Sequence, residues 1–232
     1  MLKNRSPRWS PRAVVFDCDG TLLDSEKHWM DARRHVLQGH GVALDEKFAE
    51  LAQGVHYTEC GRLMATLVGR PRLAATMTDE LLQAFRVFAS ASPVTCPGAP
   101  ALVASAASRV PLAVASNCPQ DVVETCLESA GLLGHFRHVV VPGGDVRPKP
   151  DPDVYAEAAS RCAVAPASCL ALEDSLCGIQ SAVSAGIPVI GVGENPSPEH
   201  LRLADGWVPS LADTELIAWV SGWEQYGPSG VN

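Results

Sequence analysis

The sequence predicts an α/β fold, with a doubly wound parallel sheet core that carries an inserted all-helical domain. Short apolar runs rich in Val, Ala, Leu and Ile recur along the chain and have the length and composition of buried parallel strands. Helical patterns separate most of these runs, which is typical of βαβ units. One long helical stretch interrupts the alternation after the first run. The runs lie at residues 13–16, 110–115, 138–141, 169–172 and 187–192.

The helices between the later runs carry recognisable start and stop signals. The segment "PQDVVETCLESAGLL" begins at Pro119, a residue favoured in a first helical turn, and ends near Gly131. The segment "DPDVYAEAASRCA" has the same Pro-led start, and "SLCGIQSAVSAG" joins the fourth run to the fifth. In a Rossmann-like sheet of this kind the ligand crevice lies at the carboxyl ends of the strands. We therefore expect the chemistry where the apolar runs stop.

The inserted stretch contains four helix-like segments, of which three follow a Ser or Thr suited to an N-cap, namely Ser25, Thr58 and Thr78. The segment "SPVTCPGAP" then predicts a hinge back into the core. The four expected helices span 25–39, 44–53, 58–68 and 78–89. The expected domains are a disordered basic leader at 1–12, a catalytic core at 13–24 and 93–232, and a helical domain at 25–92.

Composition excludes several classes of protein. The 232 residues are 47% apolar and carry a formal net charge of −8, and no run approaches the roughly 20 apolar residues of a membrane span. The leader is basic but lacks the apolar stretch of a secretory signal. The eight cysteines are scattered and form no zinc-binding spacing, so we interpret them as free thiols. We expect a cytoplasmic monomer or weak homodimer with neither nucleic-acid nor membrane partners.

The segment "VVFDCDGTLLDSE", residues 14–26, places Asp17 and Asp19 directly after the first apolar run. Taken alone, Asp-x-Asp-Gly is also ordinary turn chemistry. A calcium loop is excluded because the twelfth loop position is His28 rather than a liganding Glu.

Three other strand ends carry matching polar groups, Ser116 and Asn117 in "VASNCP", Lys149 in "GGDVRPKPDPDVY", and Glu173 with Asp174 in "ALEDS". Individually each has a simpler explanation, since Ser or Asn can cap a helix and a single lysine is usually solvated. Glu173 and Asp174 join Asp17 and Asp19, so four carboxylates are expected at one sheet edge. Such carboxylates repel unless a cation lies among them, and all-oxygen ligands favour Mg²⁺.

These residues resemble the motifs of a known family. The segments "DCDGTLLDSE", "ASN", "KPDPDVY" and "LEDSLCGIQSAVSAGIPVIGV" look like the four successive motifs of the haloacid dehalogenase superfamily, in the branch whose helical cap follows the first motif. The resemblance covers nearly the whole chain beyond residue 12.

The resemblance implies a role for each motif residue. Asp17 attacks phosphorus and becomes an aspartyl phosphate, and Asp19 protonates the leaving oxygen and then activates water. Lys149 and Ser116 contact the phosphoryl oxygens, while Asn117 assists. The implied Mg²⁺ ligands are Asp17, the backbone carbonyl of Asp19, Asp174 and Glu173.

The resemblance also separates reaction classes. True dehalogenases of the superfamily have no carboxylate at the position of Asp19, so this residue indicates phosphoryl transfer. The phosphonate-cleaving branch uses a cap lysine, and nothing around Lys27 or Lys47 marks a buried lysine of lowered pKa.

The nearest rival is β-phosphoglucomutase, whose cap loop resembles Lys-Gly-x-x-Arg. This chain reads "AQGVHY" there, with Gln53 for the lysine and Tyr57 for the arginine, and it has Trp29 where the mutase cap has a histidine. We therefore favour a phosphatase, although Arg62 or Arg86 could supply the missing cation.

The cap is expected to select the substrate, a sugar phosphate or a similar small phosphorylated molecule such as phosphoglycolate. Alternatively, Trp29 packs in the helical domain and the two histidines are solvated. An inactive binding module is disfavoured by the complete set of motif residues, and a dinucleotide binder by the lack of Gly-x-Gly-x-x-Gly after the first strand. The candidate substrate-binding residues of the cap are His28, Trp29, Gln53, His56 and Tyr57.

Overall fold

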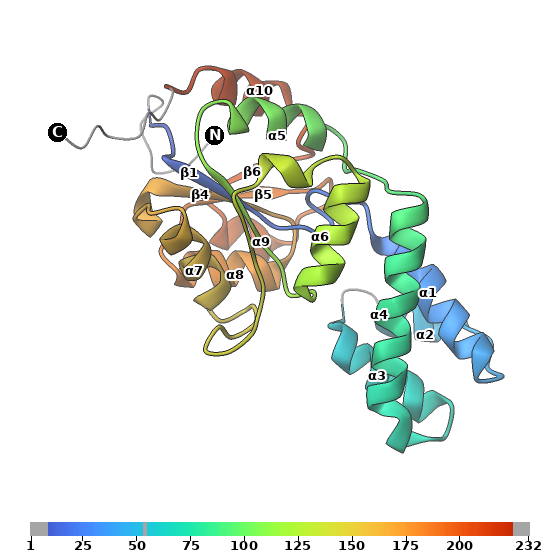
Figure 1. The fold of residues 1–232 in the computed structure, drawn as a ribbon. Coiled ribbons are helices and arrows are strands. Elements are labelled where there is room, and N and C mark those ends of the chain that lie inside the picture. Colours follow the sequence, from blue (N-terminus) through green and yellow to red (C-terminus); the bar gives the residue numbers. More distant parts are fainter. Residues whose placement is uncertain (1–8, 53–54, 225–232) are drawn as a thin grey trace. The chain divides into compact units, whose positions relative to one another are not determined.

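The computed structural model describes residues 9–52 and 55–224 (Figure 1). The chain divides into two compact units. The sheet unit consists of the described parts of Met1–Leu23 and Thr95–Asn232, and the helical unit of the described parts of Asp24–Val94.

The sheet unit contains one parallel sheet of six strands in the order β3-β2-β1-β4-β5-β6. In the centre, Val15 pairs with Ala113 on one side and with Ala171 on the other. This order confirms the predicted doubly wound α/β core. The strands are β1 (Ala13–Phe16), β2 (Leu112–Ala115), β3 (His138–Val140), β4 (Cys169–Glu173), β5 (Val189–Val192) and β6 (Gly206–Val208).

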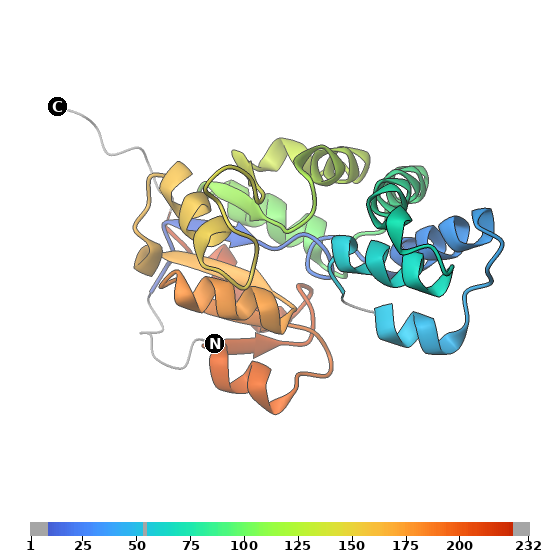
Figure 2. The ribbon, with the colours of Figure 1, turned by 90° about the horizontal axis from the view of Figure 1, so that it is seen from below.

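Helices cover both faces of the sheet (Figures 1 and 2). On one face, Ala13 and Val15 of β1 join a buried cluster with α7 (Asp153–Arg161) and α8 (Leu176–Ser184). On the other face lie α5 (Ala99–Ala107) and α10 (Thr214–Ser221), which pack against each other. All four residues of β1 are buried, which explains their continuous apolar composition.

Some elements of the sheet unit were not predicted. Strand β6 has three residues, and α10 and α9 (Pro198–Leu203) follow the last predicted run. Helix α5 begins inside the segment that was predicted to be a hinge. Its N-cap is Gly98, with φ +87°, where a Cβ atom would lie 2.2 Å from the backbone nitrogen of Ala212. The remaining elements are α6 (Gln120–Ser129) and the 3-10 turns η2 (Leu133–His135) and η3 (Pro166–Ser168).

The helical unit contains four α-helices within its described residues. They are α1 (Glu26–Gly39), α2 (Glu46–Ala52), α3 (Tyr57–Leu67) and α4 (Ala74–Ala91), with the 3-10 turn η1 (Pro71–Leu73) before α4. Two of the three predicted caps were wrong. His56 caps α3 by accepting from the Thr58 N–H, and Thr78 lies inside α4, where its hydroxyl donates to the Ala74 carbonyl. Ser25 is the N-cap residue of α1 but makes no side-chain capping bond.

No helix among the described residues combines the length and apolarity needed to cross a bilayer.

Candidate functional site

The loop after β1 turns sharply beyond Asp17. The Asp17 N–H still donates to the Leu172 carbonyl of β4, and three residues later the chain reverses through Gly20, whose φ is +90°. A Cβ atom on Gly20 would lie 2.2 Å from Oδ2 of Asp174. Glycine is therefore required twice here, for its backbone conformation and for the approach of the Asp174 carboxylate.

Lys149 lies between two carboxylates. Its Nζ is 2.5 Å from Oδ1 of Asp17 and 2.7 Å from Oε1 of Glu173, and it lies 4.9 Å from the ring centroid of Tyr155. Burial opposes the charge on Lys149, but Asp17 and Glu173 outweigh it and hold the lysine pKa well above its usual value. Burial likewise raises the pKa of Asp17, and the nearby ammonium counteracts part of that rise.

Glu173 is fully buried, and both of its carboxylate oxygens have protein partners. While Oε1 binds Lys149, Oε2 accepts from the backbone N–H of Ser175 at 2.7 Å and from its hydroxyl at 2.9 Å. The carboxylate also packs against α8, since a Cβ atom on Gly178 would lie 1.5 Å from Oε1. Glu173 thus holds Lys149 in place, and its assignment as a metal ligand stays a prediction.

Asp174 accepts a hydrogen bond from the Thr21 hydroxyl at 3.0 Å. Burial, and next the charge of Glu173, raise its pKa to about 7. Three carboxylates at this sheet edge, on Asp17, Glu173 and Asp174, therefore share one ammonium, that of Lys149.

This surplus of negative charge fits a divalent cation with oxygen ligands. Across residues 9–52 and 55–224, no cluster of three or more His, Cys, Asp or Glu side chains is arranged to hold a metal ion. The predicted Mg²⁺ set includes three such side chains, those of Asp17, Glu173 and Asp174, and within the described residues they are not arranged as a set of metal ligands. Asp19 would contribute its backbone carbonyl and water can complete the shell, as is usual for Mg²⁺.

Asp19 and Ser116 are linked through a cysteine that the sequence did not single out. The Cys118 Sγ donates to Oδ2 of Asp19 at 3.3 Å, and the Cys118 N–H donates to the Ser116 hydroxyl at 3.0 Å. Burial above all, and then the charge of Asp19, raise the pKa of the Cys118 thiol. The thiol therefore keeps its proton and acts as a donor to Asp19.

Asn117 contacts the main chain of Lys149. Its Oδ1 accepts from the Lys149 N–H at 2.8 Å, and its Nδ2 donates to the Lys149 carbonyl at 3.2 Å. The two residues are 32 positions apart, so no local sequence pattern indicates this pairing.

The predicted substrate-binding residues of the helical unit have mixed environments. His28 is buried, and Trp29 stacks on Phe85 with ring centroids 3.7 Å apart, so Trp29 takes part in the packing of this unit. The His56 ring lies 4.1 Å from that of Tyr57. Gln53 lies outside the described residues.

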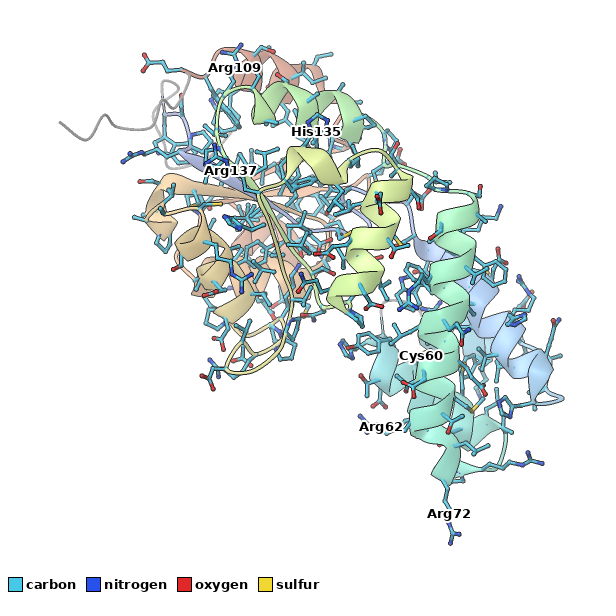
Figure 3. All side chains as sticks on the ribbon, in the orientation of Figure 1. Cys60, Arg62, Arg72, Arg109, His135 and Arg137 are labelled. Carbon is cyan, nitrogen blue, oxygen red and sulfur yellow. The ribbon has the colours of Figure 1, made fainter. Side chains whose placement is uncertain are left out.

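Arg62, one of the two arginines considered as an extra cation, extends from α3 with a side chain that is 65% exposed (Figure 3). Its Nη2 lies 2.5 Å from Oε2 of Glu59, so its charge already has a partner within the helical unit.

Known proteins similar to this chain were found by sequence and by structure. A relative from Streptomyces hygroscopicus subsp. limoneus, named validoxylamine A 7'-phosphate phosphatase, is 31% identical over 224 residues, which span 94% of this chain and 99% of the relative. The β-phosphoglucomutase of Bacillus subtilis (strain 168) is 26% identical and spans 93% and 96%. The solved structure of CbbY from Rhodobacter sphaeroides in complex with phosphate matches with a TM-score of 0.75 at 25% identity, over 91% of this chain and 99% of that chain.

The model of one family covers most of the chain. It matches residues 11–186, a span that includes the acidic loop after β1, the Ser-Asn pair after β2, Lys149, and the Glu-Asp pair at the end of β4. The chain therefore belongs to the haloacid dehalogenase-like hydrolases.

Proposed function

We propose that this protein is a Mg²⁺-dependent phosphatase that hydrolyses a small phosphorylated metabolite, with a sugar phosphate as the best candidate, through an aspartyl phosphate on Asp17. The observation that carries the proposal is the buried contact of Asp17 with the Lys149 ammonium, in a chain that also has Asp19 two residues later. Relatives named as phosphatases support the phosphatase class.

In the first proposed step, an Oδ atom of Asp17 attacks phosphorus and the bond to the leaving oxygen breaks. A carboxylate and a phosphate repel each other, and the Lys149 ammonium reduces that repulsion. The Ser116 hydroxyl is proposed to donate to a phosphoryl oxygen. Asp19 transfers its proton to the leaving oxygen, so that the product departs as an alcohol.

In the second step, Asp19 takes a proton from water, whose oxygen attacks phosphorus and releases inorganic phosphate. The Asp17 carboxylate is regenerated, and the enzyme returns to its starting state. The thiol of Cys118 donates to Asp19 in the structure and gives its carboxylate a defined orientation. Dividing one difficult displacement into two is the advantage of a covalent intermediate.

The residues that would hold Mg²⁺ are Asp17, the backbone carbonyl of Asp19, Asp174 and Glu173. When bound, the ion would neutralise charge on the transferring phosphoryl group. The helical unit is proposed to serve as the cap that selects the substrate, with His28, Trp29, Gln53, His56 and Tyr57 as its candidate determinants.

A phosphosugar mutase is the second candidate, because the Bacillus subtilis β-phosphoglucomutase is among the relatives. A mutase must hold phosphate at either end of its sugar. This chain has Gln53 and Tyr57 where the mutase loop carries its lysine and arginine. Arg62 was considered as a replacement for the cations of the mutase loop, but it forms an ion pair with Glu59, which makes it less suited to bind a second phosphate.

The test is a panel of phosphorylated metabolites incubated with the protein and Mg²⁺, with β-glucose 1-phosphate, other sugar phosphates and phosphoglycolate included. Free phosphate is measured, and the glucose 1-phosphate reaction is also assayed for glucose 6-phosphate. Phosphate release that Asp17→Asn abolishes supports the phosphatase. Isomerised sugar phosphate with little free phosphate would establish the mutase instead.

A further inference from the structure

We propose that Asn117 is a positioning residue that acts through Lys149 and makes no contact with the substrate of its own. It follows β2, whereas Lys149 lies in the loop before α7. The proposal depends on the proposed function in one respect, namely the role that Lys149 plays beside the reacting carboxylate of Asp17.

The amide of Asn117 binds both peptide groups of a single residue. It accepts from the Lys149 N–H at 2.8 Å and donates to the Lys149 carbonyl at 3.2 Å. An Asn side chain has one oxygen acceptor and one NH₂ donor group. Turning the amide over would point its NH₂ at the Lys149 N–H and its oxygen at the carbonyl, so these two contacts fix the amide orientation.

Other contacts hold the flanks of the same loop. Arg147 forms a two-bond fork with Asp153, at 2.8 Å and 2.9 Å, and the Ser181 hydroxyl donates to the Asp151 carbonyl. These contacts fix the loop on either side of Lys149. Asn117 fixes the lysine backbone itself.

The position of that backbone matters because the lysine side chain must end between two carboxylates. Its Nζ lies 2.5 Å from Asp17 and 2.7 Å from Glu173, and the side chain is only 4% exposed. Lysine has four rotatable side-chain bonds, so a displaced backbone would let the ammonium settle elsewhere. The reacting carboxylate of Asp17 would then lose its nearest positive charge.

The kinetic test is a double-mutant cycle on the full chain. A misplacement of a catalytic group by about 1 Å can cost about 10²-fold, so Asn117→Ala should lower kcat/KM by between about 10- and 100-fold. In a Lys149→Met background the same substitution should change the remaining kcat/KM by less than about twofold, since its effect operates through the absent ammonium. Gln120→Ala is the control, because this exposed amide on α6 binds Glu124 and should leave kcat/KM unchanged.

A second measurement does not depend on activity. The chain has four lysines, and NMR of protein labelled with ¹⁵N at lysine Nζ, with Lys149→Met for assignment, should show the buried Lys149 ammonium as a distinct signal. Asn117→Ala should shift or broaden that signal, and Gln120→Ala should not. Circular dichroism checks that both variants are folded.

An equal loss of kcat/KM in both backgrounds would overturn the proposal, because Asn117 would then act independently of the ammonium. An unchanged Lys149 signal in folded Asn117→Ala would overturn it as well. If Lys149→Met has no measurable turnover, the NMR signal decides alone. If the protein hydrolyses none of the tested phosphates, the proposed function fails while the NMR result still decides the role of Asn117.

Discussion

Gly178→Ala tests how tightly Glu173 is held against helix α8. In an ordinary helix this substitution stabilises by about 1 kcal/mol, because alanine loses less backbone entropy than glycine. At Gly178 the added Cβ would lie 1.5 Å from Oε1 and 2.0 Å from Cδ of Glu173. These distances are far inside van der Waals contact, so either the carboxylate or the helix must move.

The size of the effect follows from what Glu173 binds. Its side chain is fully buried, and its oxygens bind the Lys149 ammonium and both donors of Ser175. Breaking a buried ion pair costs about 3–5 kcal/mol. After subtraction of the helix gain of about 1 kcal/mol, Gly178→Ala should lower the free energy of unfolding by about 2–4 kcal/mol.

Urea denaturation followed by circular dichroism measures this change, with the slope of the transition compared between variants. Gly134→Ala is the control, since nothing lies within 4 Å of its added Cβ, and its change should stay within about 0.5 kcal/mol. A loss below about 1 kcal/mol for Gly178→Ala, well short of the expected loss of about 2–4 kcal/mol, would refute the reasoning.

Three further predictions concern charge and packing. Asp17→Asn should lower kcat by more than about 10³-fold while the circular dichroism spectrum stays unchanged, because the variant lacks the nucleophile; substantial phosphate release would contradict the mechanism. In EDTA, the free energy of unfolding should fall as pH rises from about 4 to about 7, because folded Asp174, with its pKa raised to about 7, binds a proton that the unfolded chain has released. Mg²⁺ should reduce that fall. If urea denaturation in EDTA gives the same free energy of unfolding across this pH range, the raised pKa of Asp174 among its neighbouring carboxylates is contradicted. Trp29→Ala should cost about 3 kcal/mol of stability through lost stacking on Phe85, with Trp29→Phe much closer to wild type; unchanged stability in Trp29→Ala, with a raised KM, would favour substrate contact instead.

The central strands were predictable because both of their faces are covered. The run at 13–16 coincides with β1, whose four residues are all buried. Strand β6 was not predictable in the same way, since Gly206–Val208 begins with a glycine and forms no run of Val, Ala, Leu or Ile. Helix α5 was hidden by the Pro and Gly residues at its start, which also suit a loop.

The placement of the motif residues at one sheet edge followed from the parallel topology, because parallel strands end at the same side. Their pairing did not. Asn117 meets Lys149 across 32 positions, and Cys118 meets Asp19 across 99. Such contacts depend on how two loops fold over the sheet, which local periodicity does not encode. Glycine is a sequence signal that could have indicated two close approaches, at Gly20 and Gly178, where backbone passes beside a carboxylate.

The two-sided contact of Lys149 has a consequence for the proposed catalytic cycle. When Asp17 becomes an acyl phosphate, its carboxylate no longer carries the charge that faces the ammonium. A lysine bound by Asp17 alone would then swing toward a new counter-ion. Glu173 prevents this, because it binds Lys149 at 2.7 Å and is itself anchored by Ser175. In the proposed cycle the ammonium would keep a counter-ion throughout turnover, and the site would react with little reorganisation of its own charges.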